Sequence, residues 1–210
     1  MKTELICFDL DDTLLRDTHS VMALCILADR LPELEAIEVQ EYAGELDWIE
    51  ADHQKAALLK GLEAGRLRGE LMAVLRPIGS IAETVTALQA QDIRCIIVTA
   101  GPVQVAQAVA GAYGFDDAYG SDYEVADDHF TGIITHHVGD RGKVGCLLDY
   151  ALAYGIEPEG CIAVGDGSTD IPLFEYCGRS IALNASEDAR QKADVALDTD
   201  DLRDILPHIN

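Results

Sequence analysis

The part of the chain that follows residue 77 constrains the fold most strongly, because helical and strand patterns alternate along it. Apolar residues recur at helical spacing in residues 81–91, 103–113 and 143–154. Shorter segments complete the pattern, with strands at 94–99, 161–164, 180–183 and 195–197 and helices near 171–176 and 202–206. This alternation predicts an α/β fold, an open, mostly parallel, Rossmann-like sheet with helices on both faces.

Residues 16–76 depart from this pattern, because the strand signals vanish. Helical periodicity takes their place, at residues 21–31, 37–42, 46–62 and 67–75. We therefore expect an α/β core made of residues 1–15 and 77–210, and an inserted, all-helical cap made of residues 16–76. Residues 123–134 of the core predict a β-hairpin flap.

The first apolar run ends at two carboxylates and a threonine. Asp9 and Asp11 lie two residues apart on an extended segment, so their side chains point the same way, and Thr13 follows them. Neighbouring carboxylates repel each other and resist burial. A bound divalent cation would explain the pair, and so would a nucleophile beside a general acid. The simpler interpretation is a strand followed by an acidic turn.

Three later segments place polar side chains where ligands bind in open α/β sheets, beyond the carboxyl ends of strands. Thr99 and Gly101 end one strand, Lys143 begins a helix, and Asp166 and Asp170 follow another strand. Each has an ordinary interpretation as well. The threonine can cap a helix, the lysine can be solvated, and the acids can belong to a turn. A lysine at a helix start is nevertheless unfavourable against the helix dipole, which favours a functional role.

Taken in order, these Asp, Thr, Lys and Asp motifs resemble those of the haloacid dehalogenase superfamily, in particular its phosphoserine-phosphatase-like branch with a small helical cap. The resemblance covers nearly the whole chain. It implies a Mg²⁺-dependent phosphatase that hydrolyses a small-molecule phosphomonoester through an aspartyl-phosphate.

The resemblance also implies a role for each motif residue. Asp9 is expected to be the nucleophile, and Asp11 the general acid and base. Mg²⁺ is expected on the carboxylates of Asp9 and Asp166 and on the backbone carbonyl of Asp11. Asp170 is expected to be a further ligand or to orient a water, and Thr13 to orient the loop of the nucleophile.

The phosphoryl group is expected at the other two motifs. The Thr99 hydroxyl and the backbone N–H groups of Ala100 and Gly101 would bind its oxygens, and Lys143 would neutralise it.

The sequence departs from this branch at the positions that recognise the substrate. Thr18 stands where a glutamate is usual, Lys55 where an arginine is usual, and Thr169 where an asparagine is usual. These three are the candidate substrate-binding residues, and Asp17 or Glu50 could replace the missing glutamate. Phosphoserine is therefore only the first candidate substrate, and another small phosphate ester stays open.

Other activities use similar residues. A phosphotransferase or phosphomutase shares the aspartyl-phosphate and excludes water. A phospho-Asp signalling receiver is a more remote alternative, because receivers are shorter and have no cap. Trp48 and His53, in the predicted cap, could line a substrate pocket, although core packing and solvent exposure respectively are the simpler interpretations.

The charge of the chain limits its partners. Fifteen basic and 38 acidic residues give a formal net charge of −23, which disfavours binding to nucleic acid or to anionic membranes. No apolar run approaches the ~20 residues of a membrane span. We expect a cytoplasmic protein that acts on a small phosphorylated metabolite, and an acidic surface of this kind is typical of a high-salt cytoplasm. The sequence does not determine the oligomeric state.

Overall fold

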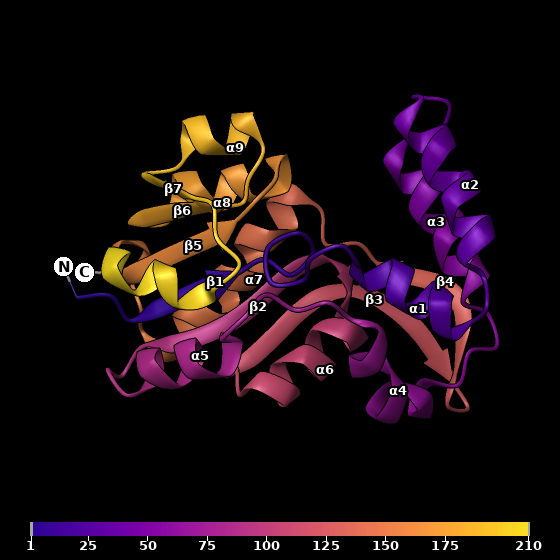
Figure 1. Cartoon of the computed structure of the whole chain (residues 1–210), viewed down its shortest axis with the longest axis horizontal. Coiled ribbons are helices and arrows are strands. Elements are labelled where there is room, and N and C mark those ends of the chain that lie inside the picture. The colour runs from indigo at the N-terminus through magenta and orange to yellow at the C-terminus, as the bar shows by residue number, and fades with distance from the viewer. Residues whose placement is uncertain (1, 210) are drawn as a thin grey trace.

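The computed structural model describes residues 2–209, apart from the side chains of residues 140 and 141. Over this range the strands form one seven-stranded sheet in the order β4-β3-β2-β1-β5-β6-β7 (Figure 1). The strands are β1 (Leu5–Phe8), β2 (Arg94–Pro102), β3 (Asp117–Ala126), β4 (His129–His136), β5 (Cys161–Gly165), β6 (Arg179–Leu183) and β7 (Val195–Leu197). Neighbouring strands pair in parallel except β3 and β4, which are antiparallel. The predicted parallel α/β sheet is confirmed.

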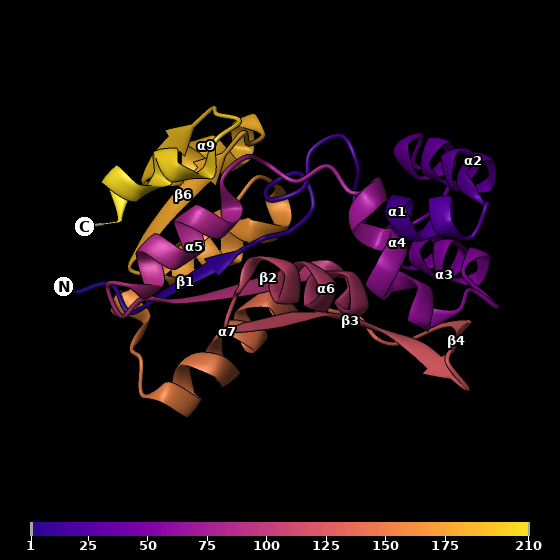
Figure 2. The ribbon, with the colours of Figure 1, turned by 60° about the horizontal axis from the view of Figure 1, so that its bottom comes forward.

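Helices cover both faces of the sheet (Figure 2). They are α5 (Ile81–Gln89), α6 (Val103–Tyr113), α7 (Asp140–Tyr154), α8 (Ile171–Tyr176) and α9 (Glu187–Lys192), with 3₁₀ turns at Pro158–Gly160, Ser168–Asp170 and Leu202–His208. Alternate residues of β1 point into two different hydrophobic clusters. Ile6 and Phe8 pack with α5 and α6, whereas Leu5 and Cys7 pack with α7 and α8. A strand covered on both faces must be apolar throughout, which explains why β1 has no polar residue before Asp9.

The segment between β1 and α5 is helical, as predicted, and we call residues 16–76 the cap. Its helices are α1 (Ser20–Leu27), α2 (Leu31–Tyr42), α3 (Trp48–Leu58) and α4 (Leu67–Val74), with a 3₁₀ turn at Ala64–Arg66. The helix predicted over 21–31 in fact ends at Leu27, because Asp29 has φ +58°, which no helix continues. The next helix begins at Leu31 and not at residue 37, and Pro32 suits its first turn.

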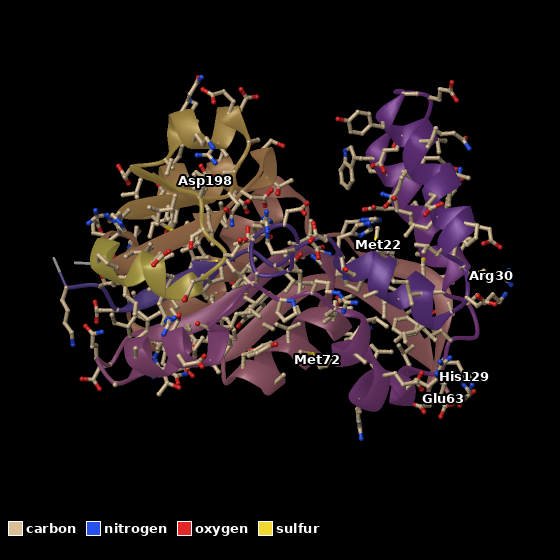
Figure 3. All side chains as sticks on the ribbon, in the orientation of Figure 1. Met22, Arg30, Glu63, Met72, His129 and Asp198 are labelled. Carbon is tan, nitrogen blue, oxygen red and sulfur yellow. The ribbon has the colours of Figure 1, made fainter. Side chains whose placement is uncertain are left out.

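Backbone hydrogen bonds join the cap to the rest of the molecule at two places. Where the chain enters and leaves the cap, Arg16 N donates to Arg76 O (2.6 Å) and Ile78 N to Leu14 O (2.9 Å). The predicted hairpin is confirmed as β3 and β4, and it reaches the chain after α3 (Figure 1). The side chains of Glu63 and His129 lie together there (Figure 3), where the two residues form a β-bridge.

Candidate active site

The central strands bring the predicted site residues together at their carboxyl ends. Asp9 directly follows β1, and its backbone N–H donates to Val164 O of β5 (2.9 Å). Thr99 lies in β2, and Asp166 directly follows β5. Because β2, β1 and β5 are adjacent and parallel, these residues meet at one edge of the sheet.

Lys143 lies at the centre of the site, between two carboxylates. It belongs to the first turn of α7, and its Nζ lies 2.6 Å from Asp9 Oδ1 and 2.8 Å from Asp170 Oδ1. Only 1% of the lysine side chain is exposed. Burial lowers the pKa of Lys143, but the charges of Asp9 and Asp170 raise it by more, so the lysine stays charged. These contacts also offset the unfavourable position of a cation at a helix N-terminus.

Three carboxylates share this single buried cation. Oxygens of Asp9, Asp166 and Asp170 all lie within 4.8 Å of one another. Burial and the charge of Asp170 hold the pKa of Asp9 well above its usual range, although Lys143 opposes them. Burial and the same neighbour raise the pKa of Asp166 to about 6. The site therefore carries more negative charge than Lys143 neutralises, and its oxygen ligands fit a hard divalent cation such as Mg²⁺.

Hydrogen bonds to a hydroxyl and to two backbone N–H groups orient these carboxylates. Thr13 Oγ lies 3.2 Å from Asp166 Oδ1 and 3.4 Å from Asp9 Oδ2, and its hydroxyl can donate to either one. Asp170 Oδ2 accepts from the backbone N–H groups of Asp166 and Gly167, both at 3.1 Å. Asp170 therefore holds Lys143 with one oxygen and the loop after β5 with the other.

The segment after Thr99 presents polar groups to the same space. Thr99 is buried, and its hydroxyl accepts from Gly101 N–H (3.0 Å), so the hydroxyl hydrogen can point at a ligand. Any Cβ at position 101 would lie 2.3 Å from Ser20 Oγ and 3.0 Å from Asp11 Oδ2. Glycine at this position lets three segments of the chain approach one another closely.

Asp11 is turned toward the cap. Its Oδ1 accepts from Ser20 N and its Oδ2 from Ser20 Oγ, both at 2.6 Å. Burial raises the pKa of Asp11, whereas the hydrogen bonds from Ser20 and the charge of His19 lower it. Ser20 is not among the residues that the sequence motifs indicate. Its available signal is a small hydroxyl residue at the start of a helix, where such side chains bind nearby polar groups.

Two cavities open beside this site, between the cap and the core. One has a volume of about 370 Å³ and is lined by Trp48, Asp52, Ala100, Val138, Gly139, Ser168 and Thr169. The other has a volume of about 300 Å³ and is lined by Asp11, Asp12, His19, Val21, Glu38, Asp52, Lys55, Ala100, Gly101 and Tyr123. Asp52 and Ala100 line both cavities. The two cavities therefore adjoin each other beside the segment that follows Thr99.

The structure places the candidate substrate-binding residues unequally. Lys55 and Thr169 each line one of the cavities, whereas Thr18 is buried and lines neither. Asp17 and Glu50 are exposed and also line neither.

The cap supplies two further lining residues, of which the sequence indicated Trp48 but not Asp52. Trp48 is 52% exposed on the cavity wall instead of packed in the core.

Comparisons with known proteins agree with this geometry. The family model described as haloacid dehalogenase-like hydrolase matches residues 6–175. A phosphoserine phosphatase from Mycobacterium tuberculosis is 31% identical over 92% of this chain and 47% of the relative. One from Methanocaldococcus jannaschii is 28% identical over 99% of this chain and 98% of the relative. The chain thus spans about half the length of the first relatives that it matches, and nearly all of the M. jannaschii protein.

Solved structures give the same result. A structure described as a phospho-aspartyl intermediate analogue of phosphoserine phosphatase has a TM-score of 0.84 at 27% identity, with 100% of both chains covered. A substrate-bound complex of phosphoserine phosphatase has the same values. The resemblance stated from the motifs and the predicted fold class are both confirmed.

Proposed function

Because this chain belongs to the haloacid dehalogenase-like hydrolases, we propose that it is a Mg²⁺-dependent phosphatase that hydrolyses a small phosphomonoester through a phosphorylated Asp9. The observation that carries this proposal is the buried Lys143, held at 2.6 and 2.8 Å between Asp9 and Asp170 beside Asp166. Such a cluster is costly to bury for structural purposes alone, because removal of charges from water is unfavourable.

Asp9 is the nucleophile in this proposal. Lys143 stays charged and contacts Oδ1, while Oδ2 lies near Thr13. A carboxylate oxygen of Asp9 bonds to phosphorus as the bond from phosphorus to the leaving alkoxide breaks. A water then attacks the same phosphorus, the bond between Asp9 and phosphorus breaks, and inorganic phosphate leaves.

Asp11 moves the protons of both steps. A carboxyl whose pKa is raised by burial can hold a proton, give it to the leaving alkoxide and take one from the attacking water. Ser20 occupies both oxygens of Asp11, so this contact must loosen as the carboxyl turns to the leaving group.

The remaining residues neutralise charge around the phosphoryl group. The Thr99 hydroxyl, the N–H groups of Ala100 and Gly101, and Lys143 would contact its oxygens. Asp9 and Asp166, together with the backbone carbonyl of Asp11, would hold Mg²⁺, with Asp170 beside them. When bound, the cation supplies positive charge against the phosphoryl oxygens.

Hydrolysis is favoured over transfer to a second substrate by the open cavity beside the site. Ser168, Thr169 and Trp48 on its wall are exposed, so water reaches the site in this state. The named activity of the relatives makes phosphoserine the first candidate substrate, and other small phosphate esters follow.

The test is release of inorganic phosphate from a panel of small phosphomonoesters with Mg²⁺, at low and high salt. Asp9→Asn should reduce the rate roughly 10³-fold or more, because it removes the attacking carboxylate. Asp92→Asn makes the same chemical change at an exposed position before the amino end of β2, at the opposite end of that strand from the site, and should leave the rate unchanged.

Turnover that persists in Asp9→Asn would refute the nucleophile assignment. Turnover that requires a second phosphate acceptor would identify a phosphotransferase.

A further inference from the structure

The leaving group of the substrate must occupy the space between the cap and the core, so the chemistry of that wall selects the substrate. Trp48 and Asp52 lie one helical turn apart on α3 and therefore on the same face of the helix. Both line the larger cavity, together with Ala100 of the expected phosphate-binding segment and Thr169. A group bound beside these two residues is thus within the same cavity as the reacting phosphate.

The indole of Trp48 is held in place but leaves part of its surface free. It meets the His137 ring edge-to-face, with centroids 5.8 Å apart at 86°, and His137 in turn meets His53 at 5.1 Å and 88°. This stack supports the indole from one side, while half of the residue is exposed to the cavity.

Asp52 is a partly buried carboxylate with a weak partner. Its closest basic neighbour is the His137 ring, at 3.6 Å between Oδ2 and Nδ1, which is longer than a hydrogen bond. Burial raises the pKa of Asp52 by more than the charge of Lys55, three residues further along α3, lowers it, so that cation does not fully compensate the carboxylate. A ligand cation on Asp52 would relieve that deficit.

The basic side chains on the described cavity walls already have carboxylate partners. Lys55 Nζ lies 2.6 Å from Glu41, and only 12% of the lysine side chain is exposed. His19 Nε2 lies 2.9 Å from Glu38. An anionic leaving group would therefore have to displace a carboxylate from either cation.

We propose that this cavity selects phosphomonoesters whose leaving group carries an alkylammonium and no carboxylate, with Trp48 and Asp52 as the ammonium subsite. The proposal rests on the proposed phosphatase function and narrows its substrate. Cation–π attraction to an indole and pairing with a carboxylate are the two interactions that recognise alkylammonium groups. Phosphoserine supplies the ammonium, but it adds a carboxylate for which the described cavity walls offer only cations that are already paired.

The first test compares four esters of similar size with the Mg²⁺-loaded protein. Phosphoethanolamine carries only the ammonium, phosphoserine both groups, phosphoglycolate only the carboxylate, and glycerol phosphate neither. We expect kcat/KM for phosphoethanolamine to exceed that for glycerol phosphate by about tenfold, and that for phosphoglycolate by about 100-fold, with phosphoserine below phosphoethanolamine.

Substitutions in the cavity wall test whether Asp52 and Trp48 cause this substrate preference. Asp52→Asn keeps the shape of the side chain and removes the charge, so it should reduce kcat/KM about tenfold for phosphoethanolamine and barely for glycerol phosphate. Trp48→Leu should act in the same direction. Glu45→Gln removes a charge from the loop before α3, at an exposed position that lines neither cavity, and should change kcat/KM for neither substrate.

Binding can be followed without turnover, because Trp48 is the only tryptophan in the chain. Its fluorescence in the metal-free protein should respond to phosphoethanolamine in a saturable way, and at about tenfold higher concentration in Asp52→Asn. Glycerol phosphate should produce no comparable response.

The outcomes separate the two proposals. If the wild-type protein releases phosphate from none of a broad ester panel, the proposed function fails. If it turns over esters but prefers phosphoglycolate or phosphoserine, or if Asp52→Asn affects all esters equally, the ammonium subsite is wrong and the phosphatase remains.

Discussion

The charged side chains of the catalytic centre differ in burial and in pairing from those of the cap wall, by which we mean the cavity-lining residues of α3. In the centre, Lys143, Asp9 and Asp170 are almost fully buried, and each charged group contacts another at 2.8 Å or less. On the cap wall, Lys55 and Asp52 lie on one helix and are partly exposed, and Asp52 has only a distant partner. Reaction and selection are thus placed on different elements of this chain, the first on strand ends and the second on α3.

This difference has an energetic meaning. A buried charge pair that loses one partner leaves the other uncompensated, at a cost of about 3–5 kcal/mol. A partly exposed pair can exchange its partner for water, and typically contributes ~1 kcal/mol or less. The centre therefore tolerates little change, whereas the cap wall can change its residues at small cost to the fold.

The two lysines provide the sharpest test of this comparison. Lys143→Met should reduce phosphate release roughly 10³-fold, because the phosphoryl group and two carboxylates lose their cation. Lys55→Met should change kcat/KM for any one ester by less than about tenfold, because Glu41, which loses its partner, is partly exposed and can be solvated. Steady-state kinetics on both variants measures the contrast, and equal losses would contradict it.

Ser20 tests the contact between the two regions. Ser20→Ala removes one of two hydrogen bonds to the charged form of Asp11, each worth ~1.5–3 kcal/mol. The pKa of Asp11 should therefore rise, and the limb of the pH–rate profile that depends on it should move to higher pH, with about a tenfold loss of rate.

A double variant identifies the route of this effect. In an Asp11→Asn background, Ser20→Ala should cause little further loss if it acts through Asp11. A full additional loss would show that Ser20 acts in another way.

The smallest expected effect concerns the stability of the metal-free protein. The pKa of Asp166 is raised to about 6 from 3.8, so the folded state binds a proton that the unfolded chain releases at lower pH. This preference stabilises the fold at pH 4 and is lost as the pH rises through about 6.

Thermal melts in EDTA should show this loss. Between pH 4 and pH 7 the wild-type Tm should fall relative to that of Asp166→Asn, whose side chain is uncharged throughout. Asp92→Asn should follow the wild type. Parallel curves for the wild type and Asp166→Asn would show that burial does not perturb this carboxyl.

The centre could be predicted from sequence because its residues stand at the ends of recognisable strands. The apolar run before Asp9 and the run before Asp166 identify parallel strands, and parallel strands bring their carboxyl ends together. Helix limits in the cap were less accurate. Periodicity alone predicts one helix over residues 21–31, but Asp29 ends the first helix early and Pro32 lies in the first turn of the next. Outside the cap, the short helix α9 was missed because its apolar face is too short to detect.

The contacts across the cleft could not be predicted in this way. Ser20 reaches Asp11 only because the intervening loop turns back, with positive φ at Asp12 and Asp17. Trp48 and Asp52 line a cavity together with core residues because α3 lies beside β4 (Figure 1), and local periodicity does not report that placement. Tertiary placement decides both.

The paired backbone at the entrance and exit of the cap has one more consequence. The chain leaves the core at Leu14 and Arg16 and returns beside them at Arg76 and Ile78. The two ends of the cap are therefore adjacent in space. For the sheet, the cap is therefore equivalent to a surface loop whose two ends are fixed. Doubling the length of such a loop costs only about 0.6 kcal/mol of closure entropy. A differently sized set of helices grafted at these four residues would leave the strand order, and with it the positions of the reacting carboxylates, undisturbed.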